Sequence, residues 1–126
     1  MRGYLVAKIL VVDDEVSLRE LLQGFLEGAG HSVATAESGA EAMTKLRADR
    51  FDLVTLDLDM PVLGGAETLK LIRRDPKLAK IPVLMCTAHG LMAEIDDAFE
   101  GGANGYIVKP FNFPALEKTV AKALKP

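Results

Sequence analysis

Three acidic residues, Asp13, Asp14 and Asp57, come directly after short apolar runs, and no other feature of the sequence is as informative. Ile9 to Val12 precedes the acidic pair, and Leu53 to Leu56 precedes the single aspartate. A carboxylate at the end of a buried strand is costly unless a positive charge accompanies it. Two carboxylates ~4 Å apart repel by about 4 kcal/mol at an effective dielectric constant of about 20. The cluster therefore requires a cation.

Two cations could meet this requirement. A hard divalent metal ion favours oxygen ligands, which carboxylates supply. Lys109 is the other candidate, because it ends a further apolar run from Tyr106 to Val108. The residues themselves leave both candidates open.

Length and composition describe one ordinary globular domain. The chain has 126 residues, of which 49% are hydrophobic and 26% charged, so it is long enough to bury a core. Its net charge of -3 gives no basic surface for nucleic acid. The single cysteine, Cys86, excludes a disulfide framework and is expected to be a small core residue. The start of the chain does not resemble a signal peptide and no run reaches transmembrane length, so we expect a cytoplasmic location without membrane contact.

The elements that must position the acidic residues alternate between apolar runs and helical patterns. The clearest helical pattern has apolar residues at a 3.6-residue period from Leu18 to Ala29. The expected strands are Lys8 to Val12, His31 to Ala36, Asp52 to Leu56, Ile81 to Thr87 and Tyr106 to Lys109. The expected helices are Leu18 to Ala29, Gly39 to Ala48, a segment around Leu69 to Ile72 that ends near Asp75, Met92 to Phe99, and about Pro114 to Leu124.

Five strand-then-helix units predict an α/β fold with a parallel sheet and helices on both faces. Crossovers in such folds are right-handed, and we expect the strand order 2-1-3-4-5. That order places a ligand-binding crevice between the carboxyl ends of the first and third strands. Asp13, Asp14 and Asp57 fall at those two strand ends, so the topology and the charges indicate the same place.

The order of four short motifs resembles the receiver domain of two-component response regulators. The motifs are Val11 to Glu15, Leu56 to Pro61, Cys86 to Ala88 and Val108 to Phe111, and the resemblance extends from Lys8 to Leu124. It implies a flavodoxin-like (βα)5 three-layer sandwich and one receiver domain over residues 1–126, with an N-terminal lead of 1–7 and a core of 8–125. It also implies a signalling domain that assists its own phosphorylation and dephosphorylation, not an enzyme.

The resemblance further implies that Asp57 accepts a phosphoryl group from a sensor histidine kinase or a histidine phosphotransfer protein. An aspartyl phosphate would form in a reaction that depends on Mg²⁺ or Mn²⁺. Asp14, Asp57 and the backbone carbonyl of Asp59 would ligate the metal, and Asp13 would act mostly through a bound water.

Lys109 would neutralise charge on the transferring group, and the Thr87 hydroxyl, helped by the Ala88 N–H, would donate to a phosphoryl oxygen. The family also suggests a cis bond between Lys109 and Pro110.

The resemblance also implies residues that transmit the phosphorylation state to a binding face and residues that set the lifetime of the phosphoryl group. Thr87 and Tyr106 would transmit phosphorylation to the face formed by the fourth helix, fifth strand and fifth helix. That face would contact a downstream protein, a fused output domain or a second copy in a phosphorylation-dependent dimer. The Asp59 side chain and His89 would tune how long the phosphoryl group survives. We expect them to slow its loss by covering it, although His89 could instead orient the attacking water.

Simpler explanations exist for single residues. Asp13 and Asp14 could cap the following helix; Thr87 could be a strand-favouring residue. Tyr106 could be a core aromatic residue with a solvated hydroxyl, and His89 an exposed loop residue.

Three other functions compete with the receiver. Asp57-Leu58-Asp59 mimics the motif of haloacid-dehalogenase-type phosphatases, although there the second acidic pair comes late in the chain. A module that binds flavin mononucleotide shares the strand order, but Asp13 and Asp14 would repel its phosphate. A pseudo-receiver would act only through protein contacts. The cognate kinase and the output are not specified, and the chain is expected to be either a stand-alone receiver or part of a larger regulator or hybrid kinase.

Overall fold

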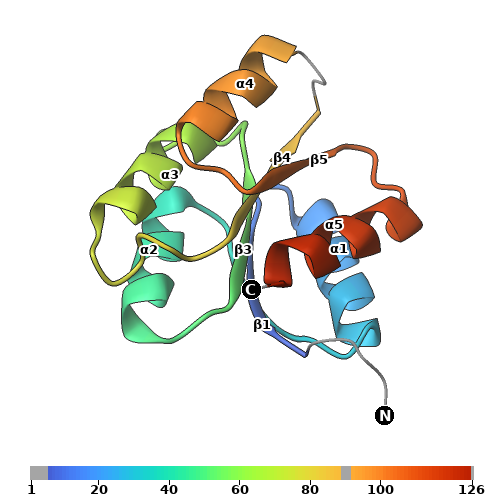
Figure 1. Cartoon of the computed structure of the whole chain (residues 1–126). Helices are drawn as coiled ribbons and strands as arrows, with labels where there is room; N and C mark the ends of the chain where they lie inside the picture. Colours follow the sequence, from blue (N-terminus) through green and yellow to red (C-terminus); the bar gives the residue numbers. More distant parts are fainter. Residues whose placement is uncertain (1–5, 89–91, 126) are drawn as a thin grey trace.

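The computed structural model describes residues 6–88 and 92–125, which form one parallel sheet flanked by helices (Figure 1). The strands are β1 (Lys8–Val12), β2 (Ser32–Ala36), β3 (Leu53–Asp57), β4 (Val83–Thr87) and β5 (Gly105–Val108). The helices are α1 (Val16–Gly28), α2 (Gly39–Ala48), α3 (Gly65–Arg74), α4 (Met92–Glu100) and α5 (Phe113–Leu124). The sheet has the order β2-β1-β3-β4-β5, with every pair parallel, so the predicted fold class and topology are confirmed.

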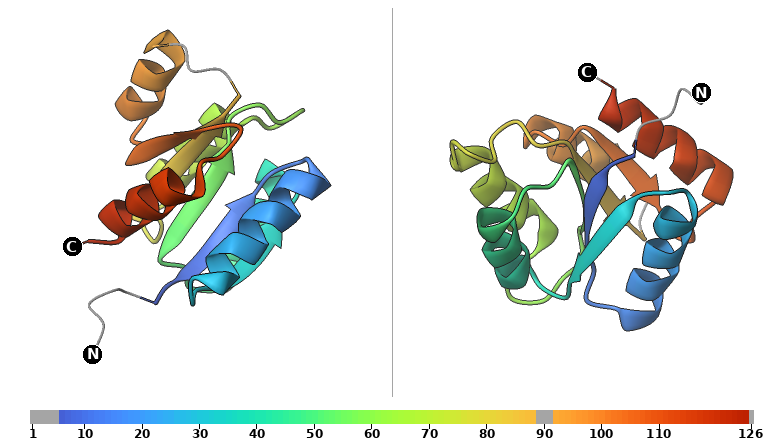
Figure 2. Two further views of the ribbon diagram at one scale, coloured as in Figure 1. Left: turned by 90° about the vertical axis from the view of Figure 1, so that its right-hand side faces the viewer. Right: turned by 90° about the horizontal axis from the view of Figure 1, so that it is seen from below.

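The sheet is the middle layer of three. Helices α1 and α5 cover one face, and α2, α3 and α4 lie on the other (Figures 1 and 2). Successive residues of β1 therefore face different cores: Ile9 and Val11 pack with the α1 and α5 side chains, whereas Leu10 and Val12 pack with those of α2 and α3. Both cores are made mostly of buried aliphatic residues, and the strand residues on both faces are among them, which explains why the strands read as continuous apolar runs.

Parallel pairing brings the strand ends together. Val12 of β1 lies beside Leu56 of β3, and Asp57 lies beside Cys86 of β4. The residues after β1 and at the end of β3 therefore lie close together at the carboxyl end of the sheet. Cys86 is buried in the core, as predicted.

The observed strands are shorter than predicted at some ends, for local reasons. β4 begins at Val83 because Pro82 has no N–H to donate to the sheet. β2 begins at Ser32, and the ring of His31 instead accepts a hydrogen bond from the N–H of Ala7 at 3.0 Å. β5 ends before Lys109, whose bond to Pro110 is cis as expected.

The loop from β3 to α3 packs directly on the strand that it leaves. A Cβ atom placed on Gly65 would lie 2.4 Å from the carbonyl oxygen of Asp57 and 2.7 Å from the Cα of Leu58. In the same loop Val62 is fully exposed and has a φ of 66°, a backbone conformation that β-branched residues rarely adopt. The loop is therefore tightly seated at its end and strained at its tip.

Among the helices in residues 6–88 and 92–125, none combines the length and the apolar character that a membrane crossing needs.

Candidate functional site

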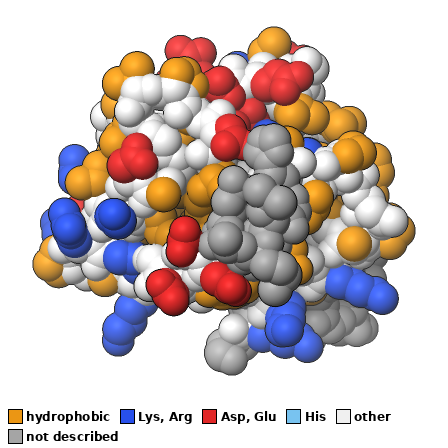
Figure 3. Space-filling view, turned by 90° about the horizontal axis from the view of Figure 1, so that it is seen from above, with side chains coloured by type: hydrophobic (Ala, Val, Ile, Leu, Met, Phe, Trp, Pro, Cys, Tyr) orange, Lys and Arg blue, Asp and Glu red, His pale blue; other side chains and the backbone are white. Residues whose placement is uncertain are grey.

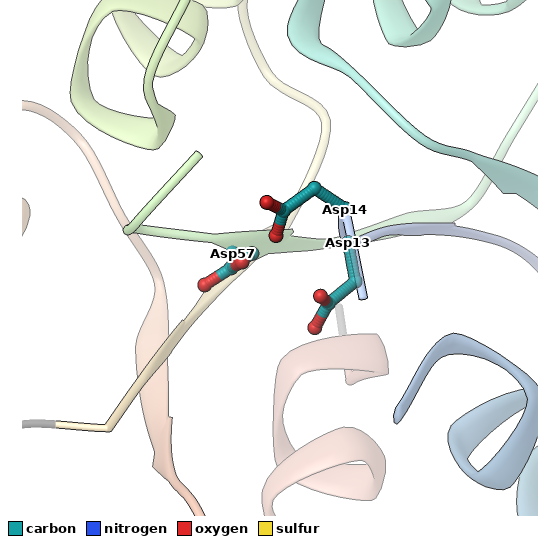
Figure 4. Close-up of side chains that lie close together, drawn as sticks. All are labelled: Asp13, Asp14 and Asp57. Carbon is teal, nitrogen blue, oxygen red and sulfur yellow. The ribbon is translucent and has the colours of Figure 1, made fainter. Parts of the chain in front are cut away.

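Asp13, Asp14 and Asp57 come together at the carboxyl end of the sheet, as predicted (Figure 4). One oxygen from each carboxylate lies within 4.8 Å of the others. Asp13 and Asp57 are 3% and 2% exposed, whereas Asp14 is open to solvent. Viewed from this end, the molecule carries many acidic side chains, and most Lys and Arg side chains lie toward the edges (Figure 3). The exposed surface at this end is therefore rich in acidic side chains.

Lys109 supplies a positive charge inside the cluster. Its Nζ lies 3.0 Å from Oδ2 of Asp13 and 3.2 Å from Oδ1 of Asp57, and the lysine side chain is only 13% exposed. Lys109 follows β5, and its main-chain N–H donates to the carbonyl oxygen of Thr87 at 2.8 Å. This hydrogen bond holds the main chain of Lys109 beside the end of β4. One of the two cations considered from the sequence is therefore present in the protein itself.

The carboxylate oxygens of the cluster differ in how many hydrogen bonds and ion pairs they accept. Asp13 accepts the N–H of Glu15 on Oδ1 at 2.9 Å and Lys109 on Oδ2, so both of its oxygens are engaged. Asp57 accepts the N–H of Asp59 at 3.2 Å and Lys109, both on Oδ1. Within residues 6–88 and 92–125, Oδ2 of Asp57 and the Asp14 carboxylate accept no hydrogen bond. These are the oxygens that can turn toward a further cation.

The acidic pair is not a helix cap. The N-cap of α1 is Glu15, which makes no side-chain capping bond, and Asp13 instead binds the Glu15 N–H with its own carboxylate. The alternative explanation of Asp13 and Asp14 as an ordinary N-cap is therefore wrong.

The charges shift the pKa values of the buried groups. Burial, followed by the negative charge of Asp13, raises the pKa of Asp57 to about 6, and the hydrogen bond from Asp59 and the Lys109 ammonium only partly oppose this. Burial on its own would lower the pKa of Lys109, but the hydrogen bond to Asp13 and the charges of both aspartates outweigh it and leave the pKa raised. One ammonium thus faces three carboxylates and does not bring the pKa of Asp57 back to its usual value.

Other predicted residues lie around the cluster. Thr87 is buried at the end of β4, one residue beyond the partner of Asp57 in the sheet. Asp59 is exposed two residues after Asp57. Tyr106 lies outside the cluster, on β5, with 41% of its surface exposed and its ring edge-on to Phe99 at 6.1 Å. His89 lies outside the described residues.

Sequence reasoning missed Arg19. Its Nη1 donates to the main-chain carbonyl oxygen of Asp13 at 2.7 Å. A signal existed, since side chains near a helix start point back toward the N-terminus, and Arg19 follows Asp13 by six residues. The spacing shows that the contact is feasible but not that it forms.

Comparison with known proteins agrees with this geometry. The family model described as "Response regulator receiver domain" matches residues 9–121, which is most of the chain. The chain belongs to this family. Receiver domains are signalling modules, which sets aside the phosphatase and flavin alternatives, and the site is the acidic pocket of a phosphoacceptor domain.

Relatives with this domain include short and long proteins. A chemotaxis protein CheY of Pseudomonas aeruginosa is 36% identical over 116 residues, covering 91% of this chain and 94% of the relative. The chemotaxis protein CheY-3 of Vibrio cholerae is 39% identical and is covered to 89%. The transcriptional regulatory protein ZraR of Klebsiella oxytoca is 42% identical, but the receiver domain matches only 26% of its length.

Solved structures share the whole fold. The chemotaxis protein CheY4 of Vibrio cholerae superposes with a TM-score of 0.90 at 38% identity, covering 95% of this receiver domain and all of that chain. NtrX of Brucella abortus superposes with a TM-score of 0.89 at 34% identity, over 27% of its chain.

Proposed function

We propose that Asp57 is the residue of this receiver domain that accepts the phosphoryl group. The observation that carries the proposal is the position of its carboxylate. It is buried at the carboxyl end of β3, bound to Lys109 through Oδ1, and leaves Oδ2 without a hydrogen bond among the described residues. A carboxylate oxygen has two lone pairs, and on Oδ2 neither is engaged by a hydrogen bond among the described residues, so the oxygen is available both for attack on phosphorus and for a metal ion.

The cluster fits a hard divalent ion, Mg²⁺ or Mn²⁺. Mg²⁺ takes one or two carboxylates and keeps several waters. Asp14 and Oδ2 of Asp57 have the available oxygens, whereas both oxygens of Asp13 are engaged. Asp14 and Asp57 would therefore ligate directly with the carbonyl of Asp59, and Asp13 would act through water. When bound, the ion supplies positive charge that stabilises the transferring phosphoryl group.

The remaining roles belong to side chains around Asp57. Lys109 reaches Oδ1 of Asp57 and is placed to neutralise an incoming phosphoryl oxygen. Thr87, at the end of the neighbouring strand, would donate its hydroxyl to a second oxygen, with help from the Ala88 N–H. The exposed Asp59 side chain and His89 would slow the loss of the phosphoryl group. For Asp59 this is supported by its exposed place two residues beyond Asp57.

We infer that the donor is a sensor histidine kinase or a histidine phosphotransfer protein, which would act on residues 8–125 as one unit in the cytoplasm. The output face would be α4-β5-α5, reached through Thr87 and Tyr106. A groove of about 860 Å³ runs along β5 and α5, and Phe99, Tyr106 and Val108 are exposed beside it. These side chains suit an apolar partner surface, either a downstream protein or output domain, or a second copy after phosphorylation.

The test is phosphorylation by a small phosphodonor. With acetyl phosphate and Mg²⁺, intact mass spectrometry should show one added phosphoryl group, and peptide mapping after reduction of the acyl phosphate should place it on Asp57. Asp57→Asn keeps the shape but removes the nucleophile, so it should not be labelled. Asp96→Asn, an exposed carboxylate of α4, is the matched control. Labelling of Asp57→Asn at the wild-type rate would refute the assignment, and an unlabelled wild type would favour the pseudo-receiver.

A further inference from the structure

Arg19 connects the second turn of α1 to the end of β1. Its guanidinium donates to the carbonyl oxygen of Asp13 at 2.7 Å, and the side chain is half-buried. The carbonyl belongs to the peptide that joins Asp13 to Asp14. The N–H of Asp13 is also fixed, because it donates to the carbonyl oxygen of Ala36 at 3.1 Å. The N–H and the carbonyl of Asp13 are thus each held by one hydrogen bond.

That peptide determines where Asp14 points. Among the described residues, no hydrogen bond holds the exposed Asp14 carboxylate itself, yet Figure 4 shows it directed toward Asp57. Its direction therefore follows from the main chain that carries it. Rotation of the Asp13–Asp14 peptide would swing the Asp14 carboxylate away from Asp57, and the bond from Arg19 opposes that rotation.

Helix stability does not explain the placement of Arg19. Basic residues stabilise the C-terminal turn of a helix, not its beginning, where the helix dipole is positive. Arg19 lies near the start of α1, and the first turn of that helix has no acidic residue to pair with it. Holding a long side chain in one rotamer also costs conformational entropy. The contact with Asp13 is the compensating interaction that the structure shows.

We propose that Arg19 is a positioning residue for the divalent cation of this receiver. By fixing the Asp13–Asp14 peptide, it presents the Asp14 carboxylate to the same ion as Oδ2 of Asp57. The inference rests on the proposed metal-dependent function of the cluster. It assigns Arg19 no contact with the ion or the phosphoryl group; its effect passes through the main chain.

The test measures metal affinity directly. Mn²⁺ binding followed by electron paramagnetic resonance of the free ion requires no activity and no intrinsic fluorophore. Arg19→Met removes the donor and keeps much of the apolar stem. We expect it to weaken Mn²⁺ binding by about 10-fold, as loss of an outer-sphere orienting group commonly does. Arg19→Lys, which keeps a charged donor, should lose less affinity than Arg19→Met.

Arg47→Met is the matched control, because Arg47 is an exposed arginine on α2, on the other face of the sheet, paired with Asp75 at 3.4 Å. It should bind Mn²⁺ with wild-type affinity. Wild-type affinity in Arg19→Met, equal losses in Arg19→Met and Arg47→Met, or equal affinities of the Lys and Met variants would each overturn the proposal.

Phosphorylation separates this inference from the function on which it rests. Arg19→Met should be phosphorylated slowly at low Mg²⁺ and at close to the wild-type rate once Mg²⁺ saturates. A rate that stays low at saturating Mg²⁺ would contradict a role through metal affinity. If the wild type binds Mn²⁺ but Asp57 is never phosphorylated, the proposed function fails while the role of Arg19 stands. If the wild type binds no Mn²⁺, both fail.

Discussion

Removing the charge of Asp57 should stabilise the metal-free protein at neutral pH. Burial and the neighbouring Asp13 raise the pKa of Asp57 from 3.8 to about 6. As the pH rises from about 4 to about 7, the unfolded chain releases this proton first, so the folded state becomes progressively less stable. The difference between the two pKa values corresponds to roughly 3 kcal/mol once the pH is well above 6. Little of this is screened, because Asp57 is 2% exposed.

Asp57→Asn abolishes that penalty and keeps an oxygen that can accept the Asp59 N–H and Lys109. Urea unfolding in EDTA at pH of about 7.5 should therefore show a gain of up to roughly 3 kcal/mol, or roughly 1 to 2 M in the midpoint. At pH of about 4 the gain should nearly vanish, because the Asp57 carboxyl group of the folded protein is then protonated and carries no more charge than the asparagine amide. Asp96→Asn serves as the control and should show no such pH-dependent gain. A gain that is absent at pH 7.5, or that is the same at both pH values, would refute the electrostatic reasoning.

Three further outcomes can be measured by unfolding experiments. Lys109→Met leaves two buried carboxylates without their ammonium and should cost about 3 kcal/mol or more at neutral pH, with a smaller loss in acid; an unchanged midpoint would show that the pair contributes nothing. Val62→Gly should stabilise the protein by about 1 kcal/mol, because glycine adopts a φ of 66° without strain; a loss of stability would mean that the exposed valine makes a favourable contact. Burial lowers the pKa of His31 from 6.5, so the unfolded chain takes up its proton more readily, and stability should fall as the pH drops through 6.5. In His31→Gln that part of the pH dependence should disappear, and its persistence would assign it to other groups.

The sequence was sufficient for the fold and for the centre of the site. The strand order and the meeting of Asp13, Asp14 and Asp57 followed from apolar runs, helical periodicity and the topology of parallel sheets. Lys109 was predicted as one of two cations, and its contacts with Asp13 and Asp57 are observed. These features depend on local periodic patterns, which the sequence displays directly, and on which strand ends lie together, which follows from the topology of parallel sheets.

What the sequence did not predict depends on three-dimensional detail. Nothing in the spacing shows that both oxygens of Asp13 are engaged or that Oδ2 of Asp57 has no such partner among the described residues. The contact of Arg19 with a main-chain carbonyl requires one rotamer out of many. The strained backbone of Val62 was equally hidden, because valine gives no sign of a positive φ. Hydrogen-bond geometry and backbone strain are settled only after the elements have packed.

Gly65 has a consequence for how this domain tolerates mutation. A methyl group there would overlap the main chain of Asp57 and Leu58, and backbone atoms cannot rotate aside as a side chain can. By contrast, a Cβ on Gly24 or Gly28 would meet nothing within 4 Å. In a library that randomises each of these positions, selection for a phosphorylatable protein should return glycine alone at 65 and many residues at 24 and 28. Gly65 carries no functional group, yet its lack of a side chain is what lets the loop pack on the main chain of Asp57, and a search confined to reactive side chains would overlook it.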